Sequence, residues 1–463
     1  MSCPREFKPH AYQSRAIDFV LDNRYAALFL DMGLGKTVIT LSALSLLIDC
    51  GEVTRCLIVA PKKVAEATWS AEAKKWRHLC HLRISTILGN AMQRAEAAER
   101  EADVYVTSRD LFADLVANHP GKRWKWDAVV IDELTSFKSP SSQRFRAFKK
   151  VRPSLYRVIG LTGTPAPNGL LDLWAQIYCL DGGERLGRYV THYRRQYFDE
   201  RRVNNIPIKC ELRPGAAEAI RAKIADISLT MQAADYLTLP PLLPHDVHVP
   251  LPPDVMKQYR AFEREKVMGW NPNNPDGAIV ASSAAALANK LQQFANGGVY
   301  TEERRVQEIH TAKAERLAEI VEAAASPVLV FYQFQHDIPR CLDRLKDYRV
   351  REYNGPDDLN AWNRGELNVL FAHPAATAYG LNMQEGGHHV VWLGTGWNLE
   401  HYQQANARLH RQGQQHPVIV HRLICPDTID ERAAAAVESK SAGQQNLLNH
   451  LKKLRATYEQ EEA

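Results

Sequence analysis

The sequence lacks the features of a secreted or membrane-spanning protein. It has eight cysteines among 463 residues and no Cys-x-x-Cys pair, which argues against a disulfide framework and against a cysteine-rich zinc site. No apolar run approaches the roughly 18 residues that cross a membrane, and the N-terminal MSCPREFKPH has no apolar core of a signal peptide. We therefore expect a cytoplasmic protein without a membrane partner.

A strong excess of one charge is also missing. The net charge is +5, which permits nucleic-acid binding without requiring it. The local group His78, Cys80 and His81 has no fourth metal ligand in view, so we interpret it as structural. With 45% hydrophobic and 24% charged residues the chain has the composition of a globular protein, and its length suits two or three domains.

The stretch Tyr25–Thr37 has the pattern of a strand, a phosphate loop and a helix. A short apolar run leads into a loop that contains Gly33, Leu34 and Gly35, and Lys36-Thr37 opens a second apolar segment. Backbone N–H groups of such a loop surround phosphates, the lysine reaches the terminal phosphates, and the threonine hydroxyl binds Mg²⁺. Leu30 stands where the strict pattern has its first glycine. The alternative is a helix start that uses Gly and Thr only as turn and cap.

A run of short, β-branched segments alternates with helical ones in the first part of the chain. We expect strands at Cys56–Ala60, Ile84–Leu88, Val104–Thr107, Ala128–Ile131 and Val158–Leu161. This alternation predicts an α/β fold with a parallel sheet and ligand sites at the carboxyl ends of its strands. Asp132-Glu133 follows one of these strands, where one carboxylate can hold Mg²⁺ and its neighbour can activate water. Two solvated acids in a loop are the alternative.

These motifs resemble those of a known family. Residues 31–37 (DMGLGKT), 132–135 (DELT) and 160–168 (GLTGTPAPN) resemble motifs I, II and III of superfamily-two helicases, and in particular of the Swi/Snf-type DNA translocases. Residues 57–69 resemble motif Ia, and residues 106–112 resemble motif Ib.

Gln13 stands in a segment that resembles the adenine-recognition segment of this family. An amide can pair with the N6 and N7 edge of adenine. Without the motifs that follow, we would interpret Gln13 as a solvent-facing helix residue.

A second α/β set begins near residue 311. Its expected strands are Val328–Tyr332, Arg349–Tyr353, Val369–Ala372, His389–Leu393 and Val418–Leu423. The spacing of Gln404, Arg408 and Arg411 predicts that all three lie on one helical face, from which the two arginines can contact a γ-phosphate. A solvated basic helix is the alternative, and the resemblance of this segment to motif VI favours the catalytic interpretation. Residues 377–384 resemble motif V, where Gly380 lets the backbone approach a nucleotide or DNA phosphate.

The resemblance implies two tandem RecA-like lobes with a helical insertion between them. We assign residues 1–181 to the first lobe, 182–310 to a helical protrusion and linker, and 311–463 to the second lobe with a C-terminal brace helix. Basic and aromatic residues alternate over Tyr193–Tyr197, which could contact DNA or form a solvated helix face. The sequence departs from the family pattern at Thr230-Met231, which replaces a double arginine, and at Gly394, which replaces an aspartate.

The resemblance further implies a DNA-dependent ATPase that moves along double-stranded DNA. ATP and Mg²⁺ are the expected cofactors, with Thr37 and Asp132 on the metal and Glu133, Gln404, Arg408 and Arg411 in catalysis. Lys62, Thr107 and Thr377 are the expected contacts to DNA phosphates. We expect a monomer, a small stand-alone form of bacterial or phage type, and a possible targeting protein. A strand-separating DNA or RNA helicase and a non-motor nucleic-acid-binding scaffold are the competing hypotheses.

Overall fold

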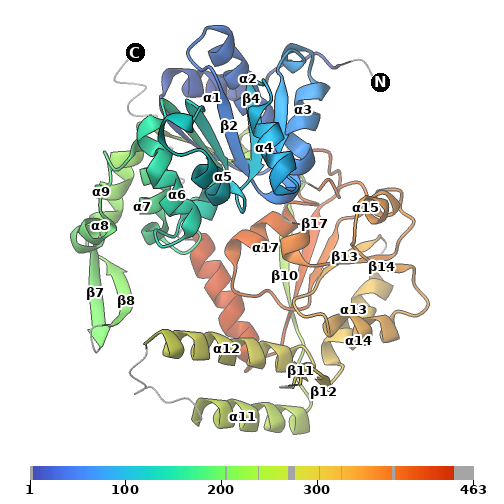
Figure 1. Ribbon diagram of the computed structural model, residues 1–463. Helices are drawn as coiled ribbons and strands as arrows, with labels where there is room; N and C mark the ends of the chain where they lie inside the picture. Colours follow the sequence, from blue (N-terminus) through green and yellow to red (C-terminus); the bar gives the residue numbers. More distant parts are fainter. Residues whose placement is uncertain are drawn as a thin grey trace. The chain divides into compact units, whose positions relative to one another are not determined.

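The protein forms two compact units in a computed structural model, shown in Figure 1. The structure describes residues 4–203, 206–237, 239–268, 277–301, 303–324, 326–377 and 381–442. The first unit contains the described residues up to Leu237 and those from Lys440 on, and the second unit contains the described residues between them. Within these residues no helix is long and apolar enough to cross a membrane.

The first unit is built on a parallel sheet of seven strands. In sheet order they are β3 (Ile84–Ile87), β4 (Val104–Ser108), β2 (Cys56–Ala60), β5 (Ala128–Asp132), β6 (Arg157–Thr162), β1 (Tyr25–Leu30) and β9 (Ser228–Met231). All five strands predicted downstream of the phosphate loop are confirmed to within one residue at each end. Every residue of β2, β4 and β6 is buried, as expected for central strands that are covered on both faces.

Helices flank this sheet (Figure 1). They are α1 (Ala11–Asp22), α2 (Lys36–Asp49), α3 (Trp69–Lys75), α4 (Ala91–Glu99), α5 (Phe112–Asn118), α6 (Gln143–Val151), α7 (Leu173–Asp181), α8 (Val190–Tyr197), α9 (Ala216–Ile224) and α10 (Ala233–Tyr236). The antiparallel hairpin of β7 (Phe198–Val203) and β8 (Ile206–Leu212) follows α8. Tyr193 and Tyr197 of α8 are buried in the core, and the Tyr193 hydroxyl donates to the Leu170 carbonyl at 2.7 Å. These two aromatic rings are therefore core residues and not a surface for stacking bases.

The second unit has a parallel sheet of six strands. In sheet order they are β10 (Leu242–His248), β17 (Val418–Ile424), β16 (His389–Trp392), β13 (Val328–Phe331), β15 (Val369–Ala372) and β14 (Val350–Glu352). The five predicted strands of this part are confirmed, again within one residue at each end. The sequence therefore identified the α/β class with two parallel sheets correctly.

The helices of the second unit are α11 (Pro253–Met268), α12 (Gly277–Ala295), α13 (Ala312–Ala323), α14 (Asp337–Arg344), α15 (Pro356–Asn363), α16 (Pro374–Thr377) and α17 (Leu399–Asn406). A last helix over residues 429–442 belongs to this unit as far as Ser439. A short antiparallel pair, β11 (Gly298–Tyr300) and β12 (Val306–Glu308), follows α12. The predicted brace helix beyond residue 442 lies outside the described residues, as does Gly380.

Sequence reasoning missed the six strands β7 to β12, which lie in the stretch that we expected to be helical insertion and linker, and two of them join the large parallel sheets. β9 pairs with β1 at the edge of the first sheet, and β10 pairs with β17 at the edge of the second. The departure Thr230-Met231 belongs to β9, where Thr230 is paired with Phe29. Both strands are thus fixed by long-range pairing partners, which a local pattern does not reveal.

Candidate active site

The phosphate loop folds as the sequence predicts. β1 ends at Leu30, and α2 begins at Lys36 with Gly35 as its N-cap. Gly33 and Gly35 adopt φ angles of 87° and 80°, in the left-handed region that L side chains rarely occupy. Gly35 provides no side-chain cap for α2, and the N-terminus of a helix favours the binding of an anion.

Lys36 lies over the start of the loop. Its Nζ donates to the carbonyl oxygens of Leu30 at 2.7 Å and Asp31 at 3.3 Å. A Cβ added at Gly163 would lie 3.3 Å from the Leu30 oxygen and 3.8 Å from Lys36 Nζ. The segment after β6 therefore lies against the phosphate loop.

Gln13 also lies at this loop. It is 7% exposed, and a Cβ added at Gly35 would lie 2.8 Å from Gln13 Nε2. Its Oε1 accepts the backbone N–H of His10 at 3.0 Å, as part of the capping box of α1. The solvent-facing interpretation of Gln13 is thus wrong, because tight packing against Gly35 places its amide at the base of the loop.

Asp132 and Glu133 stand at the carboxyl end of β5. Asp132 is the last strand residue, and Glu133 has a φ of 62°, which is uncommon outside glycine and is found at functional sites. Glu133 Oε1 accepts hydrogen bonds from Thr135 Oγ1 at 2.9 Å and from Thr162 Oγ1 at 2.8 Å. These bonds hold the carboxylate toward the end of β6, the neighbouring strand.

Burial and, to a smaller extent, the nearby Glu133 carboxylate raise the pKa of Asp132, while the Lys36 charge, a hydrogen bond from Trp69 and a backbone hydrogen bond from Glu133 lower it, and the result is a pKa of about 6. Lys36 is therefore close enough to Asp132 to affect it electrostatically. Because β5, β6 and β1 are adjacent in the sheet, the carboxyl ends of three neighbouring strands bring these groups together. The set has donors for phosphate oxygens and a carboxylate for a hard cation, so it fits a nucleoside triphosphate with Mg²⁺.

The helical placement of the motif VI residues is wrong, although two of them do converge. α17 ends at Asn406. The backbone N–H of Arg408 donates to the carbonyl oxygen of Ala405, and the side-chain Nε of Arg408 donates to the carbonyl oxygen of Gln404 at 3.1 Å. That carbonyl would otherwise accept the next helical hydrogen bond. The Gln404 side chain is buried and donates to Glu400 Oε1 at 3.3 Å within α17.

The turn after α17 brings two guanidinium groups to one acceptor. Arg408 Nη1 lies 3.5 Å and Arg411 Nη1 lies 3.1 Å from the carbonyl oxygen of Leu381, in the segment that resembles motif V. Arg408 is 7% exposed, and burial lowers the pKa of Arg411. The positive charges of Arg408 and Arg411 thus lie close together in the second unit. The turn after α17 brings them together, and not a shared helical face as we predicted.

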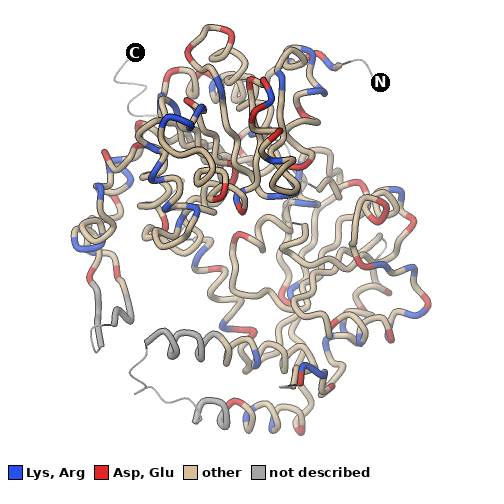
Figure 2. Tube along the Cα trace, viewed as in Figure 1, with Lys and Arg blue, Asp and Glu red and all other residues tan. Residues whose placement is uncertain are grey.

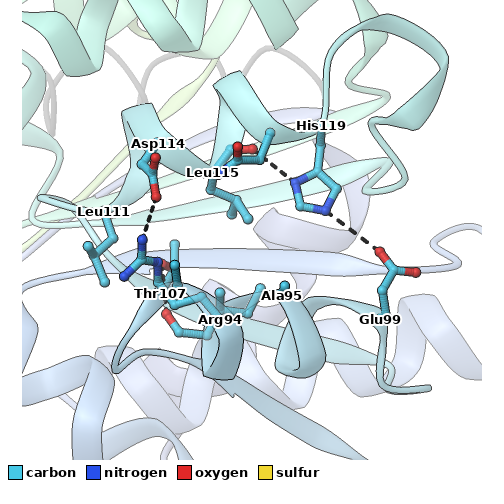
Figure 3. Close-up of a pocket in the computed structure, with 11 residues that line it drawn as sticks. Arg94, Ala95, Glu99, Thr107, Leu111, Asp114, Leu115 and His119 are labelled. Carbon is cyan, nitrogen blue, oxygen red and sulfur yellow. Dashed lines mark hydrogen bonds and ion pairs between the residues drawn. The ribbon is translucent and has the colours of Figure 1, made fainter.

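Of the three predicted DNA-contacting side chains, only Lys62 is at the surface. Its side chain is 72% exposed and lies 3.9 Å from Glu66. Thr107 is fully buried and donates to the Ile87 carbonyl, and it lines a cavity of about 280 Å³ between α4 and α5, which Figure 3 shows. Thr377 is also fully buried and donates to the Pro374 carbonyl. Hydroxyls that are held in this way are not placed for a phosphate contact, so the side-chain predictions for both threonines are wrong.

The histidines that we interpreted as structural contact helix α2. His78 Nε2 lies 2.8 Å from Ser42 Oγ, and His81 Nε2 lies 3.2 Å from Ser45 Oγ. In the described part of the chain no group of three or more potential ligands is arranged to hold a metal ion.

The departure at Gly394 lies beside a buried lysine. A Cβ at Gly394 would lie 3.3 Å from Asn296 Oδ1, and Lys313 Nζ donates to that same oxygen at 2.7 Å. Lys313 also donates to the Leu393 carbonyl at 2.7 Å and pairs with Asp430 at 2.6 Å. Glycine stands at position 394 where the family pattern has an aspartate. The negative charge next to Lys313 comes from Asp430.

Sequence reasoning missed three residues of the first unit that contact the site carboxylates, namely Thr135, Thr162 and Trp69. Thr162 lies within the motif III segment, and its position directly after a strand was a usable signal. Trp69 donates from Nε1 to Asp132 Oδ2 at 3.1 Å, across 63 residues of sequence. Nothing in the spacing of Trp69 could have shown this contact.

Comparisons with known proteins show the family of the chain. The SNF2-related domain family matches residues 12–199. Protein p41 of Acyrthosiphon pisum secondary endosymbiont phage 1 is 35% identical over 97% of this chain and 100% of its own length. The chain belongs to the SNF2-related family. As a member it is an ATP-hydrolysing enzyme.

Longer relatives and a solved structure are also similar to the chain. An uncharacterised ATP-dependent helicase of Mycoplasma genitalium is 25% identical over 93% of this chain, which spans 41% of that protein. The Sulfolobus solfataricus SWI2/SNF2 ATPase core in complex with dsDNA is 21% identical, with 96% of each chain covered and a TM-score of 0.46.

Proposed function

We propose that this SNF2-related ATPase couples ATP hydrolysis to movement along double-stranded DNA. The convergence of Lys36, Asp132 and Glu133 at the carboxyl ends of neighbouring strands supports a phosphate-cleaving site. A relative whose name describes an ATP-dependent helicase supports a nucleic-acid track.

Each residue has a defined role in this proposal. Lys36 and the amides of the loop bind the phosphates, and Gln13 contacts the adenine edge. Thr37 and Asp132 would hold Mg²⁺, which would supply positive charge to the phosphates. Glu133, oriented by Thr135 and Thr162, accepts a proton from the attacking water.

The second unit contributes positive charge. Arg408 and Arg411 stabilise the transferred phosphoryl group, a role worth about 10³–10⁵ in rate in related phosphate-loop enzymes. Burial favours this role, because a partly desolvated guanidinium interacts more strongly with an anion than a hydrated one.

The contact with DNA is expected to be electrostatic and independent of sequence. Lysine and arginine are interspersed with acidic residues along both units in Figure 2, so the track would be held by selected phosphate contacts such as Lys62. Binding should then weaken steeply as the salt concentration rises.

Two assays on the same protein distinguish a translocase from a strand-separating helicase. Displacement of a third strand from a triplex reports movement along a duplex, and displacement of one strand from a fork reports unwinding. We expect ATP-dependent triplex displacement without fork unwinding. Fork unwinding would favour the helicase hypothesis, and the absence of both with an active ATPase would contradict the motor function.

A further inference from the structure

Trp69 is a buried tryptophan that contacts the central carboxylate of the site. It is fully buried, and its indole Nε1 donates to Asp132 Oδ2 at 3.1 Å. β2, which precedes Trp69, and β5, which ends at Asp132, are neighbours in the sheet. The contact therefore connects the segment after one strand to the end of the next one.

The backbone before Trp69 has an irregular helical turn. Residues Val64–Thr68 form a π-helical turn, and α3 begins at Trp69. A π turn widens the helix and rotates the side chains that follow it, and such turns are frequent at functional sites. Trp69 is the first residue after this turn, so the turn sets the direction in which its indole points.

The hydrogen bond restrains a group that is otherwise able to rotate. The terminal torsion of an aspartate is broad, so rotamer preference alone does not fix the plane of the carboxylate. An indole N–H is a donor only, and its bond to an ionised carboxylate is charge-assisted and stronger than a bond between neutral groups. By donating to Oδ2, Trp69 restricts the rotation of the Asp132 carboxylate, which also accepts a backbone hydrogen bond from Glu133.

We propose that Trp69 is a positioning residue for the Mg²⁺-binding carboxylate, acting through its N–H bond to Asp132. The inference rests on the proposed function, in which Asp132 holds Mg²⁺. Loss of an outer partner of a metal ligand typically costs 10–100-fold in metal affinity.

The sequence offers a matched control for the packing role of a buried indole. Trp126 is 1% exposed, and its Nε1 has no hydrogen-bond partner among the described residues. Trp69→Phe and Trp126→Phe remove the same atoms from a buried site of the same unit. Only the first change removes a hydrogen bond to Asp132.

The test measures the affinity for a fluorescent ATP analogue in the full chain, once with Mg²⁺ and once with EDTA. In Trp69→Phe we expect the gain in affinity that Mg²⁺ provides to fall about 10-fold or more, with affinity in EDTA unchanged. In Trp126→Phe the gain should equal that of the wild type. In ATPase assays, Trp69→Phe should need a correspondingly higher Mg²⁺ concentration for half-maximal rate.

Equal Mg²⁺ effects in the two variants would overturn this inference while the proposed function stands. A wild-type protein that gains no nucleotide affinity from Mg²⁺ would overturn the proposed metal site and this inference with it. If Trp69→Phe does not fold, site-specific replacement of Trp69 by 3-benzothienylalanine removes the N–H and keeps the ring shape, with the same expected loss.

Discussion

Both units place a lysine and an aspartate near the carboxyl end of a parallel sheet, and they use the pair differently. In the second unit Lys313 is 2% exposed and has three acceptors, on Asn296, Leu393 and Asp430. A lysine ammonium has three donors, so this group is saturated. In the first unit Lys36 donates to loop carbonyls, and one oxygen of Asp132 binds Trp69.

The difference indicates which pair is structural and which belongs to a site. A saturated buried ion pair has no capacity left for a ligand, and its removal costs stability. Carbonyl contacts such as those of Lys36 can be exchanged for phosphate oxygens, and Asp132, with a pKa raised to about 6 mainly by burial, is still largely ionised at neutral pH and can bind a cation. Residue type alone would not have separated the two pairs.

The largest expected effect tests whether the second unit takes part in catalysis. We expect Arg411→Ala to lower kcat about 10³-fold or more, with nucleotide affinity little changed, because its charge acts on the transferred phosphoryl group. Steady-state ATPase and nucleotide-binding assays measure both. Arg364→Ala, which removes an exposed arginine paired with Glu366, is the control and should leave kcat unchanged. Wild-type turnover in Arg411→Ala would contradict the catalytic role of Arg411.

Lys313→Met tests the structural interpretation of the second pair. It leaves Asp430 buried without its ion-pair partner, so we expect the free energy of unfolding to fall by about 3–5 kcal/mol. Arg316→Met on the same helix removes a largely exposed pair with Glu319 and should cost less than about 1 kcal/mol. Urea denaturation compares the two, and equal losses would refute a special role for Lys313.

A smaller expected effect is a change of stability with pH, caused by three neighbouring histidines of the second sheet. His421 lies 3.3 Å from both His245 and His389, and burial and these neighbours lower its pKa to about 4. Between its ordinary pKa of about 6.5 and 4, the unfolded chain binds a proton that the folded chain does not, so stability falls as the pH falls. We expect His421→Gln to reduce this loss in urea denaturation at pH 7 and pH 5. Replacement of the exposed His248 by Gln should not reduce this loss of stability. A similar effect of both changes would contradict the role of His421 in the loss of stability at low pH.

The sequence was sufficient where the pattern is local. β2 and β15 have the predicted bounds because short β-branched runs between polar segments specify buried strands. β9 and β10 were missed because pairing with β1 and β17 makes them strands, and the prolines around β10 are typical of a linker. The end of α17 depends on the side chain of Arg408, whose Nε donates to the backbone carbonyl oxygen of Gln404. In β9 and β10 a long-range contact outweighs the local pattern, and at the end of α17 a side chain four residues away does so.

The most direct test of the account is the rate of ATP hydrolysis with and without duplex DNA. We expect duplex DNA to stimulate the wild-type rate several-fold. Glu133→Gln should abolish hydrolysis and retain ATP binding, because it removes the group that accepts the proton of water. Equal turnover of the wild type with and without duplex DNA would contradict the account.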